Sequence, residues 1–129
     1  MFWMNLLKNN QINDKPIITG LRNFGYSFTD NPGRTNLIQK NGYTILIDFA
    51  HNPHGMNALV NVVNNIPAKR KLLLIGQAGD RSNDDIANLV KTASQMNLDQ
   101  VIIAEIKKYM RGREPGEVPG IISNCFREN

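Results

Sequence analysis

Residues 71–86 read KLLLIGQAGDRSNDDI, and this stretch decides the fold. The continuous apolar run Lys71–Ile75 predicts a strand that is buried on both faces. A loop with two glycines follows, and Ser82 with Asp85 forms a capping box for an amphipathic helix from about Asp84 to Met96. A buried strand, a short loop and an amphipathic helix make up the repeating unit of an α/β protein.

The same alternation continues on both sides of this unit. Upstream, the β-prone segment Tyr43–Ile47 precedes a helix from Pro53 to about Asn64. Downstream, the apolar strand Val101–Ala104 leads through the polar loop Glu105–Pro115 to a final helix from about Glu117. Because helices separate the apolar strands, we expect a Rossmann-like, mostly parallel sheet with helices on both faces.

An antiparallel hairpin should open this domain. The segments Thr35–Gln39 and Tyr43–Ile47 are joined through an Asn-Gly pair, which is a strong hairpin signal. Before the hairpin, residues 2–24 predict two short helices. The second runs from about Lys15 to Asn23, with Pro16 in its first turn, where a missing N–H costs little.

Composition limits the classes of function. With 129 residues, of which 41% are hydrophobic, the chain can build one modest core. The net charge of +4 suits an acidic partner such as nucleotide phosphates or a polyanionic substrate; nucleic acid is disfavoured because no aromatic residues are interleaved with the basic cluster at residues 69–71. The single Cys125 excludes an internal disulfide and a cysteine-based zinc site.

The apolar segment Met1–Leu7 is too short to cross a bilayer, so we expect a soluble, cytoplasmic protein without membrane contacts.

The expected topology predicts where a ligand would bind. In open α/β sheets, ligands bind outside the carboxyl ends of the strands. Here these ends carry the segments Asp48–Asn52, Gly76–Arg81 and Glu105–Arg113. We therefore expect three loops of charged and glycine-containing residues at one edge of the sheet. A generic dinucleotide-binding site is disfavoured, because G-x-G-x-x-G follows none of the predicted strands.

The first of these loops lies in the motif DFAHNP at residues 48–53. It places the Asp48 carboxylate at the end of a strand and the His51 imidazole three residues later, just before a helix. A carboxylate in this position suits a grip on ribose hydroxyls. The alternative is structural, with Asp48 accepting loop N–H groups and His51 supporting the turn. The motif by itself leaves both interpretations open.

Four ordered motifs resemble those of the Mur ligases. NPGRTN at residues 31–36 is similar to NPGR-x-N, and DFAHNP at residues 48–53 is similar to D-(Y/F)-A-H-N-P. GDRSNDDI at residues 79–86 resembles GDR-x-x-(D/E)-D-I, and RGREPGE at residues 111–117 resembles the R-G-R-x-x-G-E of the cyanophycin synthetases. Over about residues 16–122, the chain thus resembles the C-terminal domain of a Mur-type ATP-dependent amide ligase.

The resemblance implies a nucleotide site. In Mur ligases, ATP with Mg²⁺ phosphorylates a carboxylic acid to an acyl phosphate, and an incoming amine attacks it to form an amide. At the matching positions, Arg34 is the catalytic arginine that reaches the ATP phosphates when the domains close, and Asp48 is the carboxylate that holds the ribose. His51 and Asn52 belong to the same motif and shape that loop or face the nucleotide. A planar, permanently charged guanidinium suits phosphate binding and stabilises charge on a transferring phosphoryl group.

The resemblance also implies an amino-acid site. Asp80, Arg81, Arg111 and Arg113 lie on loops that face the incoming amino acid in this family. The arginines are therefore candidates for binding a carboxylate or an acidic peptide side chain. Asp80, like Glu105, would hold an amine or a guanidinium. The alternative is that the arginines are solvated surface residues and that the carboxylates pair with them.

The sequence departs from a complete ligase in one respect. No G-x-x-x-x-G-K-(S/T) occurs in it, so the site for the triphosphate and Mg²⁺ is expected on a central P-loop domain, in cis or in trans. The resemblance assigns residues 1–30 to the end of that central ATPase domain and a linker. It assigns residues 31–129 to the C-terminal domain, with a sheet that we expect to be truncated at its C-terminal end. The alternative is a stand-alone, non-catalytic remnant or binding module with the same fold.

Overall fold

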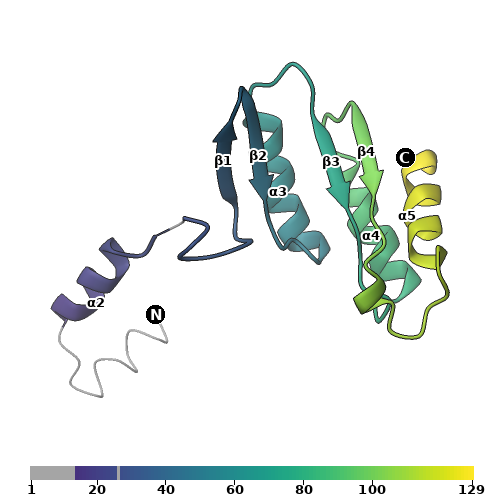
Figure 1. The fold of residues 1–129 in the computed structure, drawn as a ribbon, viewed down its shortest axis with the longest axis horizontal. Coiled ribbons are helices and arrows are strands. Elements are labelled where there is room, and N and C mark those ends of the chain that lie inside the picture. The colour runs from purple at the N-terminus through teal and green to yellow at the C-terminus, as the bar shows by residue number, and fades with distance from the viewer. Residues whose placement is uncertain (1–13, 26) are drawn as a thin grey trace. The chain divides into compact units, whose positions relative to one another are not determined.

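Figure 1 shows the chain as a computed structural model, in which residues 14–25 and 27–129 are described. The chain divides into two compact units, residues 1–49 and residues 50–129, and each is considered by itself. The first of the two helices expected within residues 2–24 lies outside the described residues. None of the helices in the described part of the chain has both the length and the hydropathy needed to span a bilayer.

The N-terminal unit contains helix α2, Asp14–Arg22. Its limits agree within one residue with the predicted helix. Pro16 lies in the first turn, where backbone N–H groups lack an intrahelical partner in any case. Ile18 and Leu21 of this helix are exposed, so its apolar side is largely open.

A two-stranded antiparallel sheet follows α2, formed by β1, Asn36–Lys40, and β2, Tyr43–Ile47. The last residue of β1 pairs with the first residue of β2, so only Asn41 and Gly42 form the turn. Both have positive φ angles, 51° and 79°, as a type I′ hairpin turn requires. The predicted hairpin is confirmed.

Residues 50–129 are all described and contain three α-helices and a parallel strand pair. In chain order the elements are α3, Pro53–Asn65; β3, Leu72–Ile75; α4, Asn83–Ala93; β4, Gln100–Ile103; the 3-10 helix η1, Lys107–Tyr109; and α5, Glu117–Glu128. The chain passes from β3 through α4 to β4, and the two strands pair in parallel (Figure 1). The Ser82 side chain accepts from the Asp85 N–H at the start of α4, which confirms the predicted cap.

One apolar core holds the C-terminal unit together. Helix α4 packs against both α3 and α5. The buried side chains come from all three helices, from β3 and from the segment after α4: Met56, Val60, Ile75, Ile86, Leu89, Val90, Ala93, Met96, Val118 and Ile122. Burying a leucine or isoleucine side chain contributes about 1.5–3 kcal/mol, so this cluster is the main source of stability of the unit.

Strand β3 differs from the prediction that it is buried on both faces. Leu73 and Ile75 pack on the core, whereas Leu72 and Leu74 are 55% and 64% exposed. Side chains alternate between the two faces of a strand, so Leu73 and Ile75 share the face that packs on the core and Leu72 and Leu74 share the other. The prediction of a doubly buried strand is therefore wrong for residues 72–75. Helices on both faces of the sheet stay a prediction.

The α/β fold class is confirmed by these elements. The structure contains an antiparallel strand pair, a parallel strand pair with α4 between its strands in the chain, and the further helices α3 and α5. The hydrogen-bonded strands form two separate two-stranded sheets among the described residues. A single sheet joining the two pairs stays a prediction.

Candidate functional site

Asp48 immediately follows β2 and holds the segment before β1. Its Oδ2 accepts hydrogen bonds from the backbone N–H of Thr35 at 2.7 Å and from the Thr35 hydroxyl at 2.9 Å. Thr35 has a φ of 50°, which is uncommon for a β-branched residue, so these bonds stabilise a strained position. The structural interpretation of Asp48 as an acceptor for loop N–H groups is confirmed. Both bonds use Oδ2, so Oδ1 remains available for another donor.

Arg34 lies beside the same end of the hairpin. Its guanidinium carbon is 5.3 Å from the centroid of the Phe49 ring, a cation–π arrangement, and both side chains are exposed. The Phe49 N–H donates to the Gly33 carbonyl oxygen at 2.8 Å. The structure thus brings together the segments that carry Arg34 and Asp48. A hollow of about 420 Å³ adjoins them, lined by Phe24, Asn31, Arg34 and Thr35.

Asn36 fixes the backbone of this loop. Its side chain is buried, and its Oδ1 accepts from the N–H groups of Gly33 at 2.7 Å and Arg34 at 3.3 Å. A buried acceptor is costly to leave unpaired, so the two bonds hold the loop that presents Arg34. Asn36 belongs to the NPGRTN motif, but its role in holding this loop was not predicted from the sequence.

His51 and Asn52 lie at the start of the C-terminal unit. The Asn52 side-chain oxygen accepts from the Gly55 N–H at 2.8 Å, which makes Asn52 the N-cap of α3. The His51 Nε2 lies 3.5 Å from the Asn52 side-chain nitrogen. Because Asp48 belongs to the other unit, a joint nucleotide site of Asp48, His51 and Asn52 stays a prediction.

The loops after β3 and β4 meet at one edge of the parallel pair, as the topology predicts. The Gly79 N–H donates to the Tyr109 carbonyl oxygen at 2.8 Å. A Cβ at Gly79 would overlap the Met110 carbonyl oxygen and lie 2.7 Å from the Arg113 Cγ. Only glycine allows this close approach, so the two loops are interlocked at this point.

Asp80 and Arg111 form an ion pair across these loops. The Arg111 Nη1 donates to the Asp80 Oδ2 at 2.7 Å, and the two side chains are 52% and 45% exposed. Such an exposed pair contributes only about 0–1 kcal/mol to stability. The Arg111 guanidinium carbon also lies 5.9 Å from the centroid of the Tyr109 ring. The alternative in which Asp80 pairs with an arginine is confirmed for Arg111.

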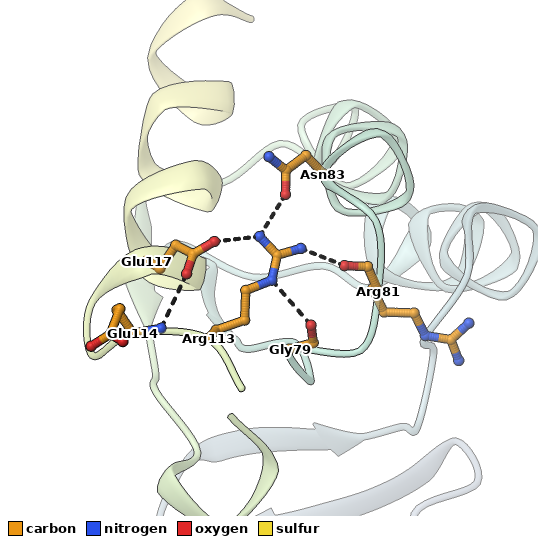
Figure 2. Close-up of polar contacts among 6 residues, drawn as sticks. All are labelled: Gly79, Arg81, Asn83, Arg113, Glu114 and Glu117. Carbon is orange, nitrogen blue, oxygen red and sulfur yellow. Dashed lines mark hydrogen bonds and ion pairs between the residues drawn. The ribbon is translucent and has the colours of Figure 1, made fainter. Parts of the chain in front are cut away.

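Arg113 is held differently from the other predicted site arginines (Figure 2). Its Nε donates to the Gly79 carbonyl oxygen at 3.0 Å, and its Nη2 donates to the Arg81 carbonyl oxygen at 2.6 Å. Its Nη1 donates to the Asn83 Oδ1 at 2.7 Å and to the Glu117 Oε1 at 2.6 Å. Its side chain is only 17% exposed. Asn83 and Glu117 were not singled out from the sequence, although Glu117 at four residues after Arg113 is a recognisable pairing distance.

Glu117 is tied to Arg113 electrostatically. The hydrogen bond from Arg113, and after it the hydrogen bond from the Glu114 backbone N–H, lower the pKa of Glu117 below its ordinary value. Its Oε2 accepts that N–H at 3.1 Å. The lowered pKa favours the ionised form of Glu117, which pairs with the Arg113 guanidinium.

The side chains of Arg81 and Glu105 differ in whether they are bound within the protein. The Arg81 side chain is exposed and points away from Arg113 (Figure 2), while its carbonyl oxygen faces Arg113. The Glu105 Oε1 accepts from the Gly116 N–H at 2.6 Å, just before α5. Arg81 is thus free to meet a ligand, whereas Glu105 supports the chain entering α5. In residues 14–25 and 27–129, no group of three or more His, Cys, Asp or Glu side chains could hold a metal ion.

Comparison with known proteins agrees with these motifs. A family model described as "Mur ligase, glutamate ligase domain" matches residues 33–122. The cyanophycin synthetase of Geminocystis herdmanii is 40% identical over 104 residues, which cover 81% of this chain and 12% of that protein. The cyanophycin synthetase of a Synechocystis species is 35% identical over 121 residues, 93% of this chain and 14% of that protein. The UDP-N-acetylmuramoyl-L-alanyl-D-glutamate–2,6-diaminopimelate ligase of Clostridium botulinum is 27% identical over 77 residues, 57% of this chain and 16% of that protein.

The chain thus spans 12–14% of the length of the two cyanophycin synthetases. The family match includes Arg34, Asp48, the loop after β3 and the loop after β4, the positions from which the resemblance was inferred. The chain belongs to the Mur ligase family, in which it matches the glutamate ligase domain and resembles the cyanophycin synthetases.

Proposed function

We propose that this chain is the C-terminal domain of an ATP-dependent acid–amino-acid ligase that resembles cyanophycin synthetase. In this role it contributes contacts to the ribose and phosphates of ATP and binds the incoming amino acid. The observation that carries the proposal is the placement of Arg34 beside the segment that holds Asp48. Two groups suited to the two polar parts of a nucleotide are thereby brought to one end of a hairpin.

The nucleotide contacts follow from the groups that remain available. Asp48 uses Oδ2 for Thr35, so Oδ1 is the acceptor for a ribose hydroxyl. Arg34 is held by an exposed cation–π contact with Phe49, which contributes about 0.5–1 kcal/mol and is readily exchanged for a phosphate. His51, which directly precedes the N-cap Asn52, and Asn52 itself are assigned to the nucleotide because they belong to the same sequence motif.

The cradle for the triphosphate and Mg²⁺ belongs to a central P-loop domain, in cis or in trans. ATP would supply the phosphoryl group that activates the carboxylic acid. Residues 1–30 are assigned to the end of that central domain and a linker, and residues 31–129 to the C-terminal domain. In this proposal Arg34, just after this boundary, neutralises charge on the phosphates when the two domains close.

The incoming amino acid is assigned to the loops after β3 and β4. A zwitterion carries an ammonium and a carboxylate, which complement Asp80 on one side and Arg81 or Arg111 on the other. The Asp80–Arg111 pair is half exposed, so exchanging it for the ligand costs little. Arg113 was expected among the binding residues, but its donors are largely engaged within the protein.

The nucleotide proposal is tested by calorimetric titration of the chain with adenosine and, separately, with ATP and Mg²⁺. We expect Asp48→Asn to weaken both ligands, because both contain the ribose. Arg34→Gln should weaken only ATP, by about tenfold or more, because only ATP carries phosphates. Thr35→Val is the matched control, since it removes a partner of Asp48 but keeps the carboxylate. Equal weakening by Thr35→Val would contradict ribose binding by Asp48.

A non-catalytic binding module with the same fold is the second candidate. The two candidates differ in a complementation assay. The chain would be mixed with a Geminocystis cyanophycin synthetase that lacks its matching segment, and ADP release would be measured. ADP release that depends on Arg34 supports the ligase domain. Retained adenosine binding without ADP release supports the binding module.

A further inference from the structure

Arg113 holds the backbone on both sides of Asp80. Its Nε donates to the carbonyl oxygen of Gly79 and its Nη2 to that of Arg81, the residues immediately before and after Asp80. We propose that Arg113 is a positioning residue, which fixes Asp80, Arg81 and Arg111 for the incoming amino acid without touching it. The inference rests on the proposed function for the identity of the ligand, but its structural part is tested separately.

The hydrogen bonds of Arg113 leave little capacity for a substrate. A guanidinium has five N–H donors, and four of those in Arg113 are engaged at 2.6–3.0 Å (Figure 2). Arg113 is also 17% exposed, against 52% for the Arg111 side chain. A bidentate contact with a carboxylate needs two donors, so it would break at least one of these bonds. Arg111 and Arg81 are therefore the arginines that can reach a ligand.

The same bonds connect four segments of the C-terminal unit. Arg113 lies on the loop after β4 and holds the loop after β3, and its Nη1 reaches the first residues of two helices, Asn83 of α4 and Glu117 of α5. Its own N–H donates to the Met110 carbonyl oxygen at 3.0 Å. Arg111 lies two residues before Arg113, so one side chain sets the relative position of Arg111 and Asp80.

The charges of these residues also indicate that Arg113 positions the site whereas Asp80, Arg81 and Arg111 contact the ligand. Glu117 neutralises the Arg113 guanidinium at 2.6 Å, so Arg113 adds little to the field that an exposed ligand experiences. Among the predicted amino-acid site residues, Asp80, Arg81 and Arg111 are exposed. An ammonium and a carboxylate are thus met by exposed groups, while the partly buried ion pair keeps those groups in place.

The first measurement is amide hydrogen exchange of the whole chain, without ligand, for the wild type, Arg113→Gln and Arg113→Lys. Arg127→Gln, an exposed arginine in the last turn of α5, is the control. Exchange at Leu89 and Val90, buried in α4, reports global unfolding. We expect Arg113→Gln to accelerate exchange at Gly79 by about tenfold beyond any change at Leu89, because a lost charge-assisted bond is worth that factor. Unchanged exchange at Gly79 relative to Leu89 overturns the proposal.

Lysine tests the geometry of the side chain. Arg113→Lys keeps the charge but has a single nitrogen, which cannot reach carbonyl oxygens on both sides of Asp80 together. It should therefore resemble Arg113→Gln in exchange at Gly79. Full rescue by lysine would overturn the positioning role, because charge alone would then suffice. If Arg113→Gln does not fold, Glu117→Gln, which weakens one of the four bonds by removing the carboxylate charge, gives the same comparison in milder form.

The second measurement separates positioning from direct contact. L-lysine, L-arginine and L-glutamate are titrated into the wild type, Arg113→Gln, Asp80→Asn and the double variant. If Arg113 acts by positioning Asp80, Arg81 and Arg111, the loss of affinity in the double variant should be smaller than the product of the two single losses. Additive losses, of about tenfold for each substitution, would indicate direct contact and overturn the proposal. If no amino acid binds the wild type, the proposed amino-acid site fails, whereas hydrogen exchange still decides the positioning role.

Discussion

The two units of this chain hold their charged residues by different means. In the N-terminal unit, Arg34 and Asp48 flank the open end of a hairpin, where the segment before β1 donates N–H groups to the side chains of Asp48 and the buried Asn36. In the C-terminal unit, Asp80 and Arg111 sit on loops anchored to a helix-packed apolar core through Arg113. Arginine therefore has three different roles in this chain. Arg34 makes a cation–π contact with Phe49, and Arg111 forms an exposed ion pair with Asp80. Arg113 is largely buried and links several segments through hydrogen bonds.

The largest expected effect tests where the stability resides. Leu89→Ala removes a fully buried side chain from the middle of α4 and should lower the free energy of unfolding by about 2–5 kcal/mol, because it leaves a cavity. Urea unfolding followed by circular dichroism measures the loss. Ile45→Ala on β2, where the side chain is 45% exposed, is the matched control and should cost clearly less. Equal losses would break the distinction between the two units.

An intermediate effect is expected at Asn36. Asn36→Ala leaves the N–H groups of Gly33 and Arg34 without their buried acceptor and should cost about 1–3 kcal/mol. The loss should be local, visible as faster amide exchange at Gly33 with unchanged exchange at Leu89. Asn57→Ala, at an exposed position of α3, is the control and should leave both rates unchanged. A loss of protection at Leu89 would show that the loop and the core unfold together.

The smallest expected effect is a pH dependence at Glu117. Hydrogen bonds from Arg113 and Glu114 lower the pKa of Glu117 in the folded chain. A carboxyl group whose pKa is lower in the folded than in the unfolded state stabilises the fold at pH values above its unfolded-state pKa. This stabilisation is lost as the pH falls through its folded-state pKa. Glu117→Gln should therefore be less stable than the wild type near neutral pH, and this difference should shrink in acid.

Urea midpoints over a pH series check this, with Glu128→Gln on the same helix as the control. Because the Glu117 carboxylate is solvent-exposed, screening keeps the effect small. Parallel curves for the wild type and Glu117→Gln would contradict the coupling between Glu117 and Arg113. They would also show that the ion pair of Arg113 contributes no more to stability than an exposed pair such as that of Arg111.

Much of the fold follows from local signals in the sequence. The Asn-Gly turn, the Asn52 and Ser82 caps and the apolar periodicity of α3 and α4 are short-range features. The strands and α-helices of the described residues lie within two or three residues of their predicted limits, whereas η1 lies in a segment that was predicted to be a loop. Burial of β3 was mispredicted, because a run of leucines does not show how many faces of a strand are covered.

The candidate site was predicted in part. Its motifs located Arg34, Asp48, Asp80, Arg81 and Arg111, and the topology predicted that the loops after β3 and β4 meet. The sequence did not separate Arg113 from Arg111, which lie two residues apart in the same motif. Their difference depends on which carbonyl oxygens come within reach, and those belong to a loop more than thirty residues earlier in the chain.

The sequence by itself determined the α/β class, the hairpin, the helix starts and the family, because these depend on residue type and spacing along a short stretch of chain. The tertiary structure alone decided which charged groups are occupied and which are free. Asp48 Oδ2 is taken by Thr35, Glu105 by Gly116, and Arg113 by four acceptors, while Arg81 stays open. Hydrogen bonds between residues distant in sequence exist only once packing has brought donors and acceptors to within about 3 Å of each other.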